Sequence, residues 1–225
     1  MNTIKPNKSK AIMLAQREVP TFIYDAVQLE GINFTLPEIQ TLMEGVTVGG
    51  HALSDQQIAV NQSEAWKQLF RWLKQDEFEV TAQRACELHL IAAKEEALEW
   101  GQFRSGGVTI AGTDYMPPKA ATLTVYFEQM LTDMAQLDDV YDQAIHLFLT
   151  MARRQFFYDV NKRMGRFMMN GLLLSRGCPA INLPYARRLE FNQLMLTFYT
   201  SGEQQPMNQF LRSCLDPRVI AIMNE

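Results

Sequence analysis

The sequence predicts a mainly α-helical bundle with one small β-hairpin, and three observations lead to this fold class. Apolar residues recur at three- and four-residue steps, as on one face of a helix, along six segments: 58–73, 82–98, 123–137, 140–151, 166–174 and 189–199. Breaking or capping residues separate several of these segments, among them Pro118, Asp139 and Gly177. A single interval, 106–116, is instead rich in β-prone residues.

The bulk composition is that of one large globular domain. The chain has 225 residues, of which 47% are hydrophobic, so it can bury a substantial core. We expect a polar tail at 1–20, a domain at 21–215 that includes an N-terminal helix, and a short tail at 216–225.

Charge, hydropathy and cysteine spacing argue against several classes of protein. The net charge of −4 is wrong for nonspecific nucleic-acid binding, which needs a basic surface. No apolar run reaches membrane-spanning length and the N-terminal residues lack a secretory signal pattern, so we expect a cytoplasmic protein without a membrane partner. Three widely separated cysteines make a disulfide framework or a zinc site improbable.

The β-prone interval 106–116 has short runs on either side of an Ala111-Gly112-Thr113 turn. We expect a small hairpin here, and the exposed edge of such a hairpin can pair with an extended peptide. An ordinary connecting loop is an equally good interpretation of the same residues.

Residues 25–38 predict a short helix that ends at Gly31 and a new helix with Thr35 as its N-cap and Glu38 three residues later. Glu30 then lies in the last turn of the first helix, where the helix dipole disfavours a carboxylate. It is either an ordinary surface residue or the partner of a cation.

The stretch before Arg166 has the composition of a phosphate site at a helix start. A helix that begins near Asn161 presents free backbone N–H groups and the positive end of its dipole. Arg163 and Arg166 share one face of that helix and can both bind phosphate, and Lys162 adds a charge. Asp159 can hold a divalent ion that bridges phosphates. The alternative is a solvated basic helix start with a capping aspartate.

This stretch resembles the signature of the Fic-domain family, His-x-Phe-x-Asp/Glu-Gly-Asn-Gly/Lys-Arg-x-x-Arg. The matching residues are Phe157, Asp159, Asn161, Lys162, Arg163 and Arg166. Two more segments match in order: 107–118 is similar to the family's flap hairpin, and 26–38 to its inhibitory helix. The resemblance covers residues 20–215 and implies a Fic-type helical bundle around a central helical hairpin, with the signature at the turn.

The resemblance also implies a reaction, the transfer of AMP from ATP to a hydroxyl of a protein side chain. It implies that Asp159 holds Mg²⁺ and that Asn161, the backbone of Lys162 and Arg163 cradle the α- and β-phosphates. Arg166 would bind the γ-phosphate.

Two further roles follow from the resemblance alone. In an inhibited state, Arg166 would pair with Glu30 instead of a phosphate. The flap would align the protein target as an added strand, through Val108, Thr109, Ile110 and Tyr115.

The sequence departs from the family signature most seriously at Gln155, which stands where the family has its catalytic histidine. A glutamine amide cannot accept the proton of the attacking hydroxyl, and loss of a general base costs about 10²–10⁴-fold in rate. The histidines of the chain, His51, His89 and His146, are expected to be structural or surface residues.

Two milder departures concern the phosphate loop and the inhibitory helix. Val160 replaces a glycine, so either the backbone there is ordinary or the phosphate cradle is distorted. Ala26 replaces a hydroxyl residue that could orient Glu30. A second Glu-Gly pair, Glu44-Gly45, lacks the sequence that follows the inhibitory motif and is the weaker candidate.

The residues favour a Fic-type protein adenylyltransferase, autoinhibited through Glu30, and whether it is an active enzyme stays open because of Gln155. The alternative is a nucleotide-binding pseudoenzyme or regulatory interaction module. A scaffold that retains only the fold is less favoured, because it has no need for this cluster of cations beside a carboxylate. The expected partners are ATP with Mg²⁺ and a protein target. The target, the nucleotide moiety transferred and the oligomeric state, a homo-oligomer included, are not identified by the sequence.

Overall fold

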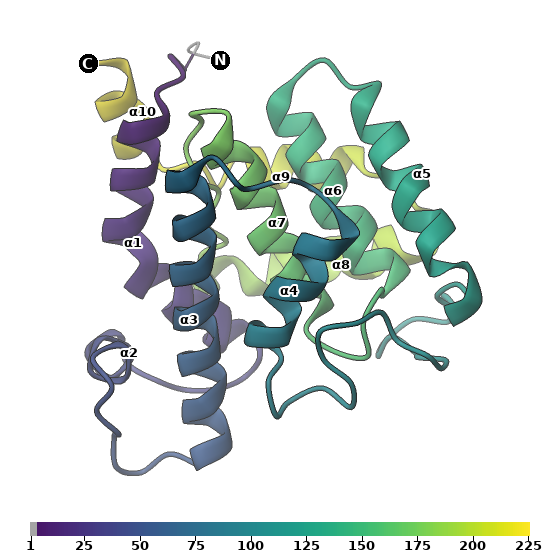
Figure 1. Cartoon of the computed structure of the whole chain (residues 1–225), viewed down its shortest axis with the longest axis horizontal. Coiled ribbons are helices and arrows are strands. Elements are labelled where there is room, and N and C mark those ends of the chain that lie inside the picture. Colours follow the sequence, from purple (N-terminus) through teal and green to yellow (C-terminus); the bar gives the residue numbers. More distant parts are fainter. Residues whose placement is uncertain (1–3) are drawn as a thin grey trace.

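The computed structural model describes residues 4–225, so residues 1–3 of the predicted tail lie outside the described part. The described chain is built of helices joined by turns and loops (Figure 1). The helices are α1 (Lys8–Leu29), α2 (Leu36–Met43), α3 (Leu53–Gln75), α4 (Ala82–Ala92), η1 (Ala120–Thr122), α5 (Leu123–Ala135), α6 (Val140–Arg154), α7 (Asn161–Ser175), η2 (Tyr185–Arg187), α8 (Arg188–Ser201), α9 (Gln205–Arg212) and α10 (Pro217–Asn224).

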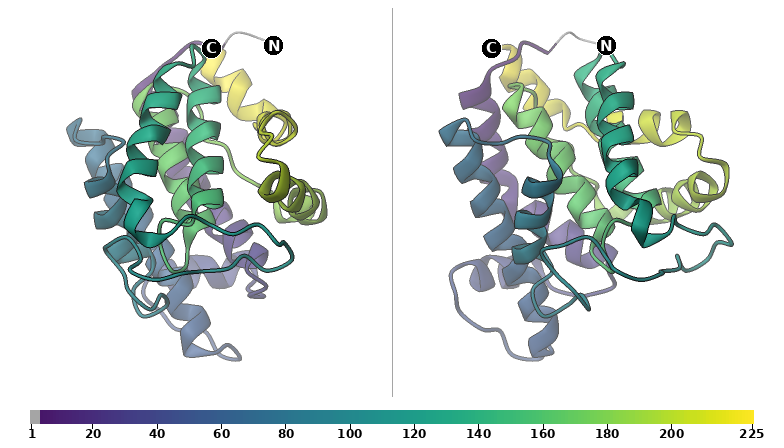
Figure 2. Two further views of the ribbon diagram at one scale, coloured as in Figure 1. Left: turned by 90° about the vertical axis from the view of Figure 1, so that its right-hand side faces the viewer. Right: turned by 45° about the vertical axis from the view of Figure 1, so that its right-hand side comes forward.

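Helices α6 and α7 form a hairpin at the centre of the molecule (Figure 2). One face of this hairpin packs, through Met151 and Met164 among others, into a buried cluster with α1, α3, α4 and α5. The other face packs, through Phe148 and Met169 among others, against α8 and α9. The hairpin is therefore covered on both sides, and the buried residues of the loop at its turn, Phe156, Phe157 and Val160, belong to the first cluster.

The six segments with helical periodicity all contain helices, α3 to α8. Helix α6 begins where the sequence predicts, because the Asp139 side chain accepts from the backbone N–H groups of Tyr141 and Asp142. Helix α4 is shorter than expected and ends at Ala92. Of the apolar residues that continue to residue 98, Ala93 and Ala97 are buried without being helical, whereas Leu98 is 77% exposed.

Helix α1 is longer than the sequence suggests. It begins at Lys8, contains Pro20 and runs without a break through the expected boundary between residues 20 and 21. Its buried residues include Leu14 and Val19, which join the same core as Phe34. At the other end of the chain, most of the expected tail 216–225 forms α10.

The predicted β-hairpin at 106–116 is wrong, because residues 4–225 contain no strand. The interval is a loop with its turn at Ala111-Gly112, where Gly112 has a φ of 82°. An isolated two-stranded hairpin is marginal in water. Here the buried guanidinium of Arg104 donates to the carbonyls of Gly106 and Pro118, so it holds the two ends of the loop without a ladder between them.

None of the helices in the described part of the chain has both the length and the apolarity that a membrane crossing requires.

Candidate functional site

The loop between α6 and α7 is shaped by its first residue, Gln155, and its last, Val160, which both have left-handed backbone, with φ of 50° and 65°. Asn161, the first residue of α7, fixes the loop between them. Its Oδ1 accepts from the N–H of Phe157 at 2.9 Å, and its Nδ2 donates to the Phe157 carbonyl at 2.8 Å. The buried Asn161 side chain is thus engaged by the loop itself.

The Gln155 side chain fastens the loop to the end of α6. Its Nε2 donates to the Ala152 carbonyl at 2.6 Å, and its Oε1 accepts from Asn161 Nδ2 at 2.9 Å. Both polar atoms of the amide therefore have protein partners. The position that would need a proton acceptor holds a structural amide.

Val160 takes the left-handed backbone despite its branched side chain, so an ordinary backbone, one of the two alternatives from the sequence, does not hold. A non-glycine residue in this conformation costs about 1–2 kcal/mol. The Val160 side chain is buried, which offsets the strain, because burial of a valine stabilises by about 1.5–3 kcal/mol.

The first turn of α7 is a positively charged helix end. Its N-cap, Val160, supplies no side-chain hydrogen bond, so the first backbone N–H groups lack a capping group. Lys162 and Arg166 are half-buried there, and neither has an ion pair within residues 4–225. Burial lowers the pKa of Arg166 to about 10, against the opposing charge of Glu30, so Arg166 stays charged at neutral pH. This end of α7 is suited to anions.

Arg163 is deeply buried, with 3% of its surface exposed, and it is held by Glu96. Its NH1 donates to Glu96 Oε2 at 2.8 Å and its NH2 to the other oxygen of the same carboxylate. Burial alone would lower the pKa of Arg163, but the hydrogen bonds and charge of Glu96 outweigh it and the net shift is upward. The sequence gave no indication of Glu96.

Glu30, the C-cap of α1, points at the same cations. Its Oε1 lies 3.7 Å from Arg163 Nε, which has no hydrogen-bond partner within residues 4–225. Burial raises the pKa of Glu30, but the charges of the α7 cations outweigh this effect, so its pKa lies below the usual value. Arg166 contributes through its charge, whereas the ion pair itself joins Glu30 to Arg163.

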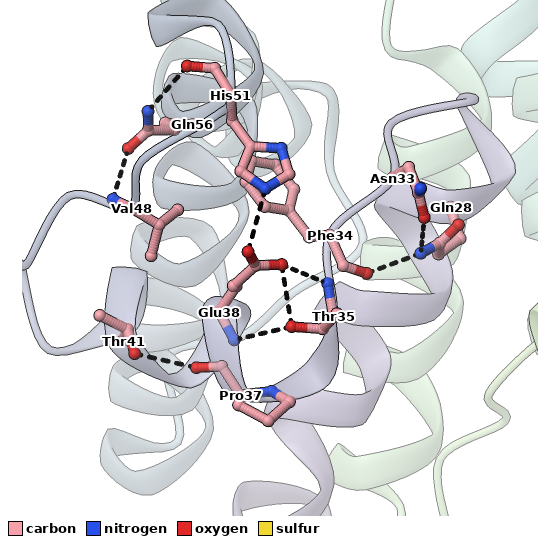
Figure 3. Close-up of polar contacts among 10 residues, drawn as sticks. All are labelled: Gln28, Asn33, Phe34, Thr35, Pro37, Glu38, Thr41, Val48, His51 and Gln56. Carbon is pink, nitrogen blue, oxygen red and sulfur yellow. Dashed lines mark hydrogen bonds and ion pairs between the residues drawn. The ribbon is translucent and has the colours of Figure 1, made fainter.

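The chain after Glu30 is fixed by a compact polar corner (Figure 3). Gly31 takes a φ of 84°, which ends α1 as predicted. The buried Gln28 then donates through Nε2 to the Phe34 carbonyl at 2.7 Å, across the turn. The carboxylate of Glu30 is therefore carried on a turn that is tied back to its own helix.

The start of α2 completes this corner. Thr35 and Glu38 form the predicted capping box, in which Glu38 Oε2 accepts from Thr35 N at 2.7 Å. The other carboxylate oxygen of Glu38 lies 3.2 Å from His51 Nε2, and the His51 ring packs on Phe34 with ring centres 4.1 Å apart (Figure 3). His51 is thus a structural residue, as expected.

Asp159 is exposed at the mouth of the loop. Its Oδ1 accepts from the N–H of Val160 at 2.6 Å, and its other carboxylate oxygen has no partner among the described residues. Within residues 4–225, no group of three or more His, Cys, Asp or Glu side chains could hold a metal by itself. Asp159 can therefore supply one carboxylate to a metal ion that takes its other ligands from a bound molecule or from water.

His89, far away in sequence, lies directly against this loop. Its ring stacks on Phe157 with ring centres 3.8 Å apart, and its Nε2 lies 3.3 Å from the Asp159 carbonyl. Its Nδ1 accepts from the N–H of Gly101 at 3.1 Å. Burial lowers the pKa of His89 to about 4, so it is neutral and Nε2 carries the proton that Asp159 accepts.

The expected flap residues lie in the loop that replaces the hairpin. Val108 and Ile110 are half-buried and Thr109 is exposed. Tyr115 is half-buried beneath the Arg153 guanidinium, 4.1 Å from the ring centre. Tyr115 thus lies near the end of α6, and none of these four residues belongs to a strand.

Comparisons with known proteins agree on one family. The sequence model of the Fic/DOC family matches residues 79–173. The chain is 26% identical over 203 residues to a protein adenylyltransferase Fic of Drosophila willistoni, and 27% identical over 202 residues to that of Drosophila erecta. These alignments cover 86% of the chain but only 39% and 40% of the relatives, so the chain spans less than half the length of the curated relatives it matches.

Solved structures share the fold at lower sequence identity. A Fic-domain signaling protein from Bacteroides thetaiotaomicron superposes with a TM-score of 0.77 at 18% identity, over 99% of this chain and 90% of that one. Residues 134–508 of Fic-1 from Caenorhabditis elegans superpose with a TM-score of 0.77 at 16% identity, over 91% of this chain and 61% of that one.

Proposed function

Because the Fic/DOC family model matches residues 79–173, we propose that the chain is a protein adenylyltransferase of this family, which transfers AMP from ATP to a hydroxyl of a protein side chain. The names of its Drosophila relatives support this reaction type over a role as a scaffold or a nucleotide-binding pseudoenzyme. In the reaction, the hydroxyl oxygen bonds to the α-phosphorus of ATP and pyrophosphate leaves.

The observation that carries this proposal is the uncapped, cationic first turn of α7. Its free backbone N–H groups supply donors for phosphate oxygens, and Arg166 and Lys162 supply charge without being engaged by ion pairs within residues 4–225. A helix end of this kind, with the positive end of the dipole and two half-buried cations, favours the binding of a polyphosphate anion.

A magnesium ion would fit this site if Asp159 and the bound nucleotide coordinate it together. Asp159 has one carboxylate oxygen without a partner within residues 4–225, and Mg²⁺ bound with nucleotides commonly takes one carboxylate, phosphate oxygens and water. When bound, the ion would neutralise phosphate charge during transfer. Asp159 would hold it.

Gln155 sets the expected rate of transfer. Its amide is hydrogen-bonded to Ala152 and Asn161 and cannot accept the hydroxyl proton, which must therefore pass to solvent. Positioning and charge supply much of the catalysis of phosphoryl-type transfer, so we propose slow rather than absent activity.

Glu30 is proposed to hold the enzyme in an inhibited state. Its carboxylate faces the cations that a nucleotide phosphate would use, at 3.7 Å from Arg163 Nε. A phosphate that enters must replace this carboxylate or push it aside.

Labelled ATP with Mg²⁺ tests the proposal on four proteins: wild type, Glu30→Gly, Gln155→His and the double variant. We expect ATP to bind more tightly to Glu30→Gly than to wild type. We expect labelling of the protein itself or of an added protein mixture to be strongest in the double variant, by about 10²–10⁴-fold over Glu30→Gly alone. The matched control is Glu44→Gly, which removes the exposed C-cap carboxylate of α2 in the same Glu-Gly context.

The outcomes separate the parts of the proposal. Absence of ATP binding by all four proteins overturns it entirely. Binding without labelling by the double variant overturns the transferase and leaves a nucleotide-binding protein. Equal effects of Glu30→Gly and Glu44→Gly overturn the inhibitory role of Glu30.

A further inference from the structure

The guanidinium of Arg163 is shared by two carboxylates that reach it from different parts of the chain. Glu96, in the turn that follows α4, takes both terminal nitrogens, and Glu30, at the end of α1, faces the remaining nitrogen. We propose that Glu96 is a second internal competitor of nucleotide phosphate at Arg163, and that it sets the affinity of the site for polyphosphates. This inference rests on the nucleotide binding proposed above.

The hydrogen bonds of Arg163 leave little for a ligand. NH1 and NH2 each donate to one oxygen of Glu96, so this carboxylate occupies the edge of the guanidinium that carries the two terminal nitrogens, while Nε has no hydrogen-bond partner within residues 4–225. A bidentate pair with a phosphate needs two parallel donors. In the resting state, Glu96 holds the edge with the terminal nitrogens and Glu30 faces the edge with Nε, so a phosphate can form a bidentate pair with Arg163 only by displacing a carboxylate.

The charge of the site leads to the same conclusion. Glu30 and Glu96 together balance two of the three cations of α7, Lys162, Arg163 and Arg166. Removal of Glu30 alone would leave Arg163 neutralised by Glu96. Full attraction for a polyphosphate anion thus requires both carboxylates to be displaced.

Glu96 lies where withdrawal is feasible. It lies in the turn four residues after Ala92, the last helical residue of α4, and the residue before it, Glu95, has left-handed backbone with a φ of 61°. Its side chain retains 15% exposure, against 3% for the Arg163 side chain. The carboxylate can therefore rotate toward water, whereas the guanidinium is fixed in the core.

Glu96→Gln tests this competition, because it keeps the shape of the side chain and one acceptor while it removes the charge. We expect its apparent Kd for Mg²⁺–ATP, measured by calorimetry, to fall by about tenfold or more relative to wild type. Without nucleotide, its melting temperature should fall by roughly 5–10 °C because a buried cation loses its partner. Saturating ATP should raise the melting temperature of Glu96→Gln by more than it raises that of the wild type.

Glu95→Gln is the matched control, since the neighbouring exposed carboxylate lies beside Lys94 and does not contact Arg163. Its affinity for ATP should stay close to that of the wild type. Glu96→Asp keeps the charge but shortens the side chain, and it should give an intermediate affinity. This second variant keeps the test decisive where Glu96→Gln does not fold.

Glu30→Gly separates this inference from the proposed function. If neither wild type nor Glu30→Gly binds ATP, the proposed function fails, and the inference fails with it. If Glu30→Gly binds ATP but Glu96→Gln in the same background binds equally or more weakly, Glu96 merely positions Arg163, and only the competition is overturned. A further tightening in the double variant supports two independent competitors.

Discussion

His89 shows how one buried side chain can hold the site together. Its ring nitrogens bridge the N–H of Gly101 and the carbonyl of Asp159, and its face covers Phe157. Protonation would turn the accepting nitrogen into a donor directed at an N–H group and would place a charge near Arg163. The site therefore depends on His89 being neutral.

This dependence predicts a specific pH effect on stability. The pKa of His89 is lowered to about 4 in the folded state, from about 6.5 in an unfolded chain, so its stabilising contribution is complete above pH 6.5 and is lost as the pH falls toward 4. The free energy of unfolding of the wild type, minus that of His89→Gln, should fall by about 3 kcal/mol between pH 7.5 and pH 4. Urea titrations at several pH values measure this difference.

Glutamine is the appropriate replacement because it can keep one donor and one acceptor without titrating. Parallel pH profiles for the two proteins would contradict the assignment of a neutral, buried His89. The pH profile of a second variant, His51→Gln, can be compared with that of His89→Gln. The His51 ring lies beside the Glu38 carboxylate in the corner after Glu30.

At the scale of residues, the sequence predicted the members of the site that stand next to each other in the chain. Asp159, Asn161 and Arg163 lie together because one helix start carries them. Glu96 and His89 were missed, since their contacts span about 70 positions and nothing nearby distinguishes Glu96 from Glu95. The roles of the site residues in binding stay predictions.

At the scale of elements, the central helices α6 and α7 approach closely at Gly165. A Cβ atom at this position would lie 2.9 Å from the carbonyl oxygen of Phe148 on α6, and 2.9 Å from its ring. Real Cβ atoms essentially never come this close to other heavy atoms, and a backbone carbonyl cannot move away alone. Glycine is thus a condition for the spacing of the hairpin that carries the site.

Gly165→Ala should therefore destabilise the protein even though alanine is the better helix former. Alanine gains about 1 kcal/mol in helix propensity, while overpacking costs typically 1–3 kcal/mol, with further strain from the backbone contact. We expect the free energy of unfolding to fall by about 1–2 kcal/mol in denaturant titrations. Gly49→Ala, with no heavy atom within 4 Å of the added Cβ and no left-handed backbone, should change it by less than about 0.5 kcal/mol.

The helices were predicted well where apolar periodicity is strong. The prediction failed where a residue distant in sequence determines the local structure. The capping residues Thr35 and Asp139 mark helix starts as expected, because a cap is a local hydrogen bond. The hairpin failed because β-propensity is a weak preference, whereas Arg104 secures Gly106 and Pro118 from outside the segment.

At the scale of the whole molecule, α1 joins the beginning of the chain to its core. The polar and lysine-rich start and the proline at position 20 hid this helix from sequence interpretation, although apolar residues recur along it. Yet residues on both sides of Pro20 are buried in the same cluster as α3 and α7. The helix that ends at Glu30 is therefore anchored along its whole length.

Leu14→Ala tests this anchoring. Leu14 is 7% exposed, and loss of a buried leucine side chain costs about 2–5 kcal/mol, so we expect a fall of this size in the free energy of unfolding. Its neighbour Met13 is 42% exposed, and Met13→Ala should change the stability by less than about 0.5 kcal/mol. Similar small changes in both variants would instead indicate a tail that contributes nothing to the core.

The contacts of Arg104 determine which changes of length and sequence the loop at 106–116 can accept. Besides Gly106 and Pro118, it donates through Nε to the Gln155 carbonyl at 2.6 Å, and its own N–H donates to the Phe156 carbonyl. Both ends of the segment are therefore anchored to the α6–α7 loop, while its middle has no ladder to preserve. Closure entropy grows slowly with loop length, so the residues between the two anchors are free to vary in number and kind without disturbing the loop beneath. Insertions or deletions in this short surface loop should thus leave the α6–α7 loop, and the site it carries, in place.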